Sequence, residues 1–162
     1  MDISFNKLTT ITAKSIPDKI QTISLNDNAI TRIDPLTFSG KKHLVRVDLY
    51  ANQIVKLESS SIRLPPRDLR SKKQRPMFYF GKTSTFNGTF LYCWNIFPGG
   101  NPFLCDCNLE WLQSINNEEN FSLYPIVNDL ESIYCRLMFS KENAFVPLVE
   151  VGCWIFQFFM EV

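Results

Sequence analysis

The chain spells out one nearly complete copy of the pattern L-x-x-L-x-L-x-x-N-x-L, in Leu44-Val45-Arg46-Val47-Asp48-Leu49-Tyr50-Ala51-Asn52-Gln53-Ile54. An upstream copy keeps the same register through Ile20, Ile23, Leu25, Asn28 and Ile30, and a truncated one has Met1, Ile3, Asn6 and Leu8. The three asparagines are 22 and 24 residues apart. A period between about 20 and 29 residues with these apolar positions indicates leucine-rich repeats, which stack into a solenoid.

The spacing within each copy predicts how a coil folds. Ile23 and Leu25, like Val47 and Leu49, alternate with polar residues, which indicates a short strand with one buried face. Strands of successive coils then form a parallel sheet. Where the chain turns inward, an asparagine amide can bond backbone groups that the turn leaves unpaired. We therefore expect a structural ladder of Asn6, Asn28 and Asn52, with Ile33, Leu36 and Phe38 entering the core from an irregular convex side.

The residues between the core positions point to the concave face, which is the usual binding surface of a solenoid. Arginine and tyrosine are frequent among residues that dominate binding energy, and this face offers both. An ordinary solvated sheet face remains the alternative. The binding candidates are Thr22, Ser24, Asn26, Arg46, Asp48 and Tyr50.

A second motif follows in Asn101-Pro102-Phe103-Leu104-Cys105-Asp106-Cys107-Asn108-Leu109-Glu110-Trp111-Leu112. The last coil of a solenoid exposes its core, so a capping unit must cover it. We expect a helix from Leu109 to about Ile115, with Asn108 as its N-cap. The predicted fold class is thus α/β, a leucine-rich-repeat solenoid fragment with a small helical, disulfide-bonded C-terminal cap.

The motif of residues 101–112 resembles the cysteine-rich C-terminal flanking unit of extracellular leucine-rich-repeat proteins. Further strings narrow the resemblance to the ectodomain of an insect-type Toll receptor, over about residues 1–80 and 99–151. They are Asp2 to Leu8, Thr37 to Gly40, Val47 to Ile54, Gly99 to Leu112, Tyr124-Pro125, and Asp129 to Cys135.

The resemblance implies two disulfides, one from Cys105 to Cys135 and one from Cys107. The candidate partners of Cys107 are Cys153 and Cys93, neither of which lies in a stretch that matches the family. It also implies an oxidising cell-surface setting, on the extracellular side of the plasma membrane. The parent receptor would have a signal peptide, a membrane span and an intracellular signalling domain, and we find none of these in this sequence.

The sequence divides into five parts. Residues 1–62 hold about three repeats, 63–80 form a basic, proline-containing connector, and 100–151 form the cap. Residues 81–99 and the tail 152–162 do not follow the family pattern. If residues 82 to 99 are removed, the join reads Phe-Tyr-Phe-Gly-Gly-Asn-Pro-Phe, so we interpret the insert as a retained intron and the tail as translation past an exon end. The alternative is a genuine loop.

Charge and motif content exclude several classes of function. The chain has 17 basic and 16 acidic residues, so an electrostatic case for nucleic acid is missing. No nucleophile or acid–base constellation can be assembled, and we expect no enzyme, cofactor or small-molecule substrate. A zinc site of Cys105, Cys107, Cys135 and His43 fits no common ligand spacing. Asn120 begins a glycosylation sequon.

These features predict a protein-binding fragment of a Toll-type cell-surface receptor, acting in innate immunity or development. Its partners would be a protein ligand or another receptor ectodomain, and it would meet the membrane only through the parent. A secreted or matrix leucine-rich-repeat adhesion protein is the alternative, and an intracellular signalling domain in the full gene separates the two.

Overall fold

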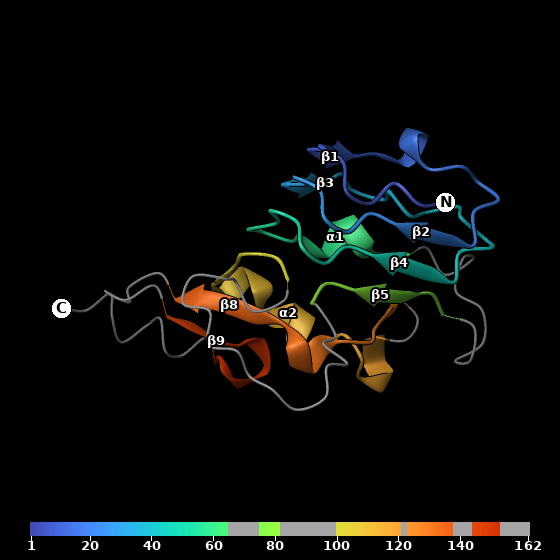
Figure 1. The fold of residues 1–162 in the computed structure, drawn as a ribbon. Helices are drawn as coiled ribbons and strands as arrows, with labels where there is room; N and C mark the ends of the chain where they lie inside the picture. Colours follow the sequence, from blue (N-terminus) through green and yellow to red (C-terminus); the bar gives the residue numbers. More distant parts are fainter. Residues whose placement is uncertain (65–74, 82–99, 121–122, 138–143, 153–162) are drawn as a thin grey trace, which may run out of the picture.

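The computed structural model describes residues 1–64, 75–81, 100–120, 123–137 and 144–152. Figure 1 shows stacked coils that begin at the N-terminus and end on a unit containing α2, β8 and β9. The leucine-rich-repeat fold predicted from the sequence is confirmed, because short parallel strands from successive coils form one sheet and their apolar residues form one continuous core.

The principal sheet has four parallel strands in the order β2-β4-β5-β7. Their bounds are β2 Thr22–Ser24, β4 Arg46–Asp48, β5 Met77–Tyr79 and β7 Ile126–Val127. Each strand has a buried central or terminal residue that faces the core, because alternate residues of a strand point to opposite faces. These residues are Ile23, Val47, Phe78 and Val127, none more than 1% exposed.

The convex side carries a smaller sheet in which β1 (Thr10–Ile11) pairs in parallel with β3 (Arg32–Ile33). After the third coil comes the short helix α1, Ser59–Ile62. Ile33 and Phe38 are buried here as predicted, but Leu36 is 48% exposed and the prediction for it was wrong. Leu36 has a left-handed backbone (φ 56°) in a turn, which directs its side chain away from the core.

The asparagine ladder links each coil to the one before it. Asn28 donates to the carbonyl of Ile3 (3.0 Å) and accepts from the amide of Leu8 (3.0 Å). Asn52 repeats this one coil later with the carbonyl of Leu25 and the amide of Ile30. Asparagine suits the position because one amide can be donor and acceptor at once.

Asn6 differs from these two asparagines. It is exposed, and its amide donates only within its own coil, to the carbonyls of Ile3 and Ser4. Asn101 fills a further rung: it donates to the carbonyls of Leu49 (2.9 Å) and Phe80 (3.1 Å) and accepts from the amide of Ile54. The sequence pattern did not identify Asn101 as a member of the asparagine ladder, because the insert lies directly before it.

Aromatic side chains carry the core from the repeats into the cap. Phe38 meets Phe78 edge to face with ring centroids 4.8 Å apart, and Phe80 meets Phe103 at 6.0 Å. All four rings are at most 1% exposed. Edge-to-face rings pack densely, so the cap and the repeats share one core.

The cap is built on a three-stranded sheet as well as on its helix. Strand β6 (Phe103–Cys105) pairs in parallel with β8 (Tyr134–Leu137), which pairs antiparallel with β9 (Phe145–Pro147). The helix α2 is shorter than predicted, Glu110–Gln113, and follows a 3-10 turn at Cys107–Leu109. Its N-cap residue is Leu109; Asn108 instead donates to the carboxylate of Asp106, so the prediction of an Asn108 cap was wrong.

One predicted boundary also needs correction. We assigned residues 63–80 to a connector, but Met77–Tyr79 form β5 in the middle of the principal sheet. Most of the predicted connector (65–74), the insert 82–99 and the tail from 153 lie outside the described residues.

Candidate functional site

The concave face of the principal sheet is the candidate binding site. Register fixes its rows: Thr22 lies opposite Arg46 and Arg46 opposite Met77, while Asp48 lies between Ser24 and Tyr79. Residues two apart on a strand share a face, so these side chains project away from the buried row of Ile23, Val47 and Phe78.

Arg46 is the best-defined side chain on this face. Its Nε donates to both carboxylate oxygens of Asp48, at 2.9 and 3.0 Å. Its guanidinium carbon lies 4.2 Å from the centroid of the Tyr79 ring. The side chain is nevertheless 45% exposed. A charged group that is both stacked and hydrogen-bonded is held in one geometry, which lowers the entropy lost when a partner binds.

The six concave candidates are not equally accessible. Thr22 and Arg46 are exposed, and Ser24 and Tyr50 are half-buried. Asn26 and Asp48 are each only 6% exposed, so they cannot offer a partner much surface. The Asn26 amide donates a hydrogen bond to the Asp27 carboxylate (2.9 Å), and the Asp48 carboxylate accepts one from Arg46. Nearby carboxylates and partial burial both raise the pKa of Tyr50, burial most, so its phenol stays protonated.

The sequence analysis missed two residues of this face, Met77 and Tyr79. Both are half-buried on β5, and the Tyr79 hydroxyl contacts the Met77 sulfur at 3.9 Å. The alternation Met77-Phe78-Tyr79-Phe80 is itself a strand signal. Because Phe78 follows Val47 by 31 residues rather than by the 22–24 of the repeat, the period alone did not reveal it.

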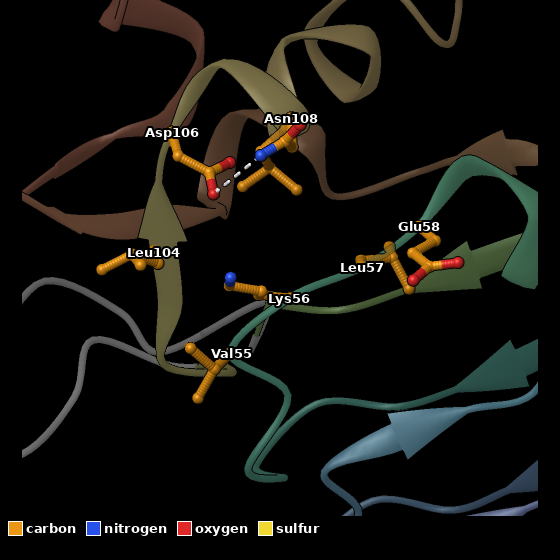
Figure 2. A pocket seen from close by; sticks show the side chains of 8 residues that line it. Val55, Lys56, Leu57, Glu58, Leu104, Asp106 and Asn108 are labelled. Atoms are coloured by element: carbon orange, nitrogen blue, oxygen red, sulfur yellow. Dashed lines mark hydrogen bonds between the residues drawn. The ribbon is translucent and has the colours of Figure 1, made fainter. Parts of the chain in front are cut away.

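A second hollow lies on the convex side, where the third coil meets the cap (Figure 2). This pocket of about 370 Å³ is lined by Val55, Lys56, Leu57, Glu58, Leu104, Asp106, Asn108 and Leu109. Figure 2 shows Lys56 in the middle of the pocket, with Asp106 in one wall and Glu58 in the opposite wall. The charged side chains of the lining are Lys56, Glu58 and Asp106.

Two buried charged residues hold the cap against the repeats. Asp129 is 3% exposed and accepts hydrogen bonds from the amides of Phe80 (3.1 Å) and Gly81 (2.6 Å). Burial raises the pKa of its carboxyl to about 6, against the lowering effect of those amide bonds. Arg75 is 5% exposed and donates to the carbonyls of Tyr124 and Pro125, and burial lowers its pKa.

Cys105 and Cys135 form a disulfide in the cap. With Cys107, which is also disulfide-bonded, three of the four residues of the alternative zinc site are therefore unavailable as thiolates. No cluster of metal-ligating side chains occurs within the described ranges. Cys107 is also disulfide-bonded, and its two candidate partners, Cys153 and Cys93, lie outside the described residues.

Asn120, the first residue of the sequon, is half-buried, and its amide donates to the carbonyl of Ser114 at 2.8 Å. The other two sequon residues lie outside the described part of the chain. Among the described residues, no helix has the length and apolar content needed to cross a membrane.

Sequence comparison finds similarity to a Toll-like receptor and to other leucine-rich-repeat proteins. Toll-like receptor 7 of Drosophila melanogaster is 36% identical over 148 residues, which is 91% of this chain and 9% of the receptor. "Leucine-rich repeat and fibronectin type III domain-containing protein 1" is 27% identical in Homo sapiens and 30% in Danio rerio, each over 74% of this chain. The chain spans 14% and 18% of those two proteins. No protein-family model matches it.

Among solved structures, human trophoblast glycoprotein, also named Wnt-activated inhibitory factor 1, is similar with a TM-score of 0.52. The match covers 94% of this chain and 45% of the glycoprotein at 14% identity, so it supports the fold alone.

Proposed function

This chain is a leucine-rich-repeat segment of the Toll type with its C-terminal cap, and we propose that it binds protein partners through the concave face of its sheet. The observation that carries the proposal is Arg46, half-exposed yet fixed by Asp48 and the Tyr79 ring. Arginine and tyrosine held rigidly on an accessible face are typical of residues that contribute most to protein–protein binding.

At the level of the parent protein, the proposed role is that of a cell-surface receptor that signals in innate immunity or development. Similarity to a Toll-like receptor over 91% of the chain supports this role. A protein ligand or a second receptor ectodomain would be the partner. A glycan on Asn120 belongs to the same proposal.

The adhesion alternative rests on the similarity to leucine-rich repeat and fibronectin type III proteins, which covers 74% of the chain. Extending the gene downstream separates the two. An intracellular signalling domain after a membrane span supports the receptor, and a frame that ends without one supports adhesion.

Binding through the concave face is tested with two matched variants. Thr22→Glu places an acidic group on the exposed start of β2, and Thr31→Glu places the same group on the exposed convex side. The purified chain is screened by surface plasmon resonance against secreted proteins and receptor ectodomains of the source organism. We expect Thr22→Glu to weaken the binding that is found by about tenfold or more, and Thr31→Glu to leave it unchanged. The reverse pattern would contradict a concave site.

A further inference from the structure

The concave face has unused hydrogen-bond donors at its centre. A guanidinium group has five N–H donors, and in Arg46 the single Nε–H donates to the carboxylate of Asp48. Within the described part of the chain, no acceptor contacts the four N–H groups on its terminal nitrogens. Because the side chain is stacked on Tyr79 and remains 45% exposed, these donors are held at the surface in a defined direction.

The nearby carboxylates are already engaged. Asp48 accepts from Arg46, Asp27 accepts from the amide of Asn26 at 2.9 Å, and Asp2 accepts from the amide and hydroxyl of Ser4. The Tyr50 phenol, whose pKa is raised, adds another protonated hydroxyl to the face. Each nearby carboxylate thus has a hydrogen-bond partner among the described residues, whereas the terminal nitrogens of Arg46 have none.

Apolar surface lies on one side of these donors. Met77 and Tyr79 are half-buried on the neighbouring strand, and Ile126 lies opposite Met77 on β7. An arginine set among aromatic and methionine side chains is the composition that protein interfaces enrich. Partial removal from water also strengthens the hydrogen bonds that the arginine makes.

We infer that the concave face recognises a protein segment that presents an aspartate or glutamate to the terminal nitrogens of Arg46, with an apolar or aromatic neighbour against Met77 and Tyr79. The inference rests on the proposed protein-binding function and specifies the chemistry of its partner. A carboxylate matches because its two oxygens can accept in parallel from the guanidinium fork, which an amide or a hydroxyl does less well.

The test uses two random-sequence peptide libraries on phage, one with all residues and one without aspartate and glutamate, selected on the immobilised chain. We expect binders from the complete library only, each with an acidic residue beside an aromatic or apolar one. Their affinity falls about tenfold or more on Arg46→Gln and on Arg46→Lys, since lysine keeps the charge and loses the fork. Lys14→Gln, an exposed cation on the convex side, is the matched control.

Circular dichroism melting checks that each variant is folded, and Tyr79→Leu tests the stacked ring without altering charge. Binders that arise equally without acidic residues, or that keep their affinity for Arg46→Gln, overturn the inference. If such binders are still lost on Thr22→Glu, the proposed concave function survives. If no binder depends on Thr22, the proposed function and the inference both fail.

Discussion

The side-chain amide of Asn101 donates a hydrogen bond to the carbonyl oxygen of Leu49 at 2.9 Å, across 52 positions of sequence. This is the bond that Asn52 makes to Leu25, one coil earlier. In the earlier coil, two residues separate Leu49 from Asn52. Between Phe80 and Asn101 the repeat geometry thus needs only two residues, and Gly81 and Gly100 supply them.

The first prediction is that a chain without residues 82–99, with Gly81 joined directly to Gly100, folds and is more stable. The two glycines already meet: a Cβ on Gly100 would lie 3.2 Å from the Gly81 Cα and 2.8 Å from the Phe80 carbonyl oxygen. Removing a long connection lowers the entropy cost of closure, on the order of 2 kcal/mol. Urea denaturation of the shortened and the full chain measures the difference in their free energies of unfolding.

A glycine–serine segment of the same length in place of 82–99 is the control, because it keeps the entropy cost and changes only the sequence. Loss of cooperative unfolding in the shortened chain would show that the insert belongs to the fold. Sequencing of spliced transcripts across the Gly81–Gly100 junction independently tests the retained-intron interpretation, which consistent inclusion of the insert would defeat.

A second prediction separates the buried rungs of the asparagine ladder from the exposed one. Asn52→Ala leaves the amide of Ile30 without a partner and the carbonyl of Leu25 with only the side-chain amide of Asn28, and water does not easily replace Asn52 because that residue is 2% exposed. We expect a loss of about 2–4 kcal/mol in the free energy of unfolding. Asn6→Ala removes only bonds within an exposed turn and should cost about 0.5 kcal/mol or less. Equal losses at the two positions in urea denaturation would contradict the ladder's role.

The sequence predicted those parts of the fold that are periodic. Alternation of apolar and polar residues identified β2 and β4, and the asparagine period identified Asn28 and Asn52, because each depends on neighbours close in sequence. Strand β5 and the place of Asn101 in the asparagine ladder were not predicted, because the connector and the insert break the period on either side of Phe78 and Phe80.

Of the candidate site, sequence alternation placed Thr22 and Arg46 on an accessible face but could not measure burial. Asn26 and Asp48 fall on the same face and are covered, because their own hydrogen bonds to Asp27 and Arg46 draw them in. The stacking of Arg46 on Tyr79 joins strands 31 residues apart, so no local pattern contains it.

A third prediction concerns pH. In the folded chain the pKa of Asp129 is raised to about 6 from 3.8, by burial first and also by the charge of Asp48. Between about pH 4 and pH 6 the folded state then binds more protons than the unfolded state, so this group's contribution to stability falls as pH rises through that window. The change is about 2–3 kcal/mol at most.

Asp129→Asn removes this contribution while keeping one oxygen to accept from Phe80 or Gly81. We expect the variant's free energy of unfolding to vary less between about pH 4 and pH 7, and to match or exceed the wild type near pH 7. Asp129→Ala, which loses both acceptors, should be destabilised across the whole range. A wild type that gains stability relative to Asp129→Asn as pH rises would reverse the assigned sign.

The last prediction separates the two disulfides of the cap. The Cys105–Cys135 bond closes 30 residues of chain, so Cys105→Ser with Cys135→Ser should cost about 3–4 kcal/mol through the greater freedom of the unfolded state.

Cys107→Ser tests the other bond, whose partner is Cys153 or Cys93. The amide of Gln113, on the helix that follows Cys107, donates to the carbonyls of Leu148 and Val151, which brings the chain just before Cys153 to α2. We therefore expect non-reducing peptide mapping by mass spectrometry to recover Cys107 with Cys153, and the chain lacking residues 82–99 to retain that bond. Recovery of Cys107 with Cys93 would instead show that the insert is covalently tied to the cap, and its removal would then free Cys107 as a reactive thiol.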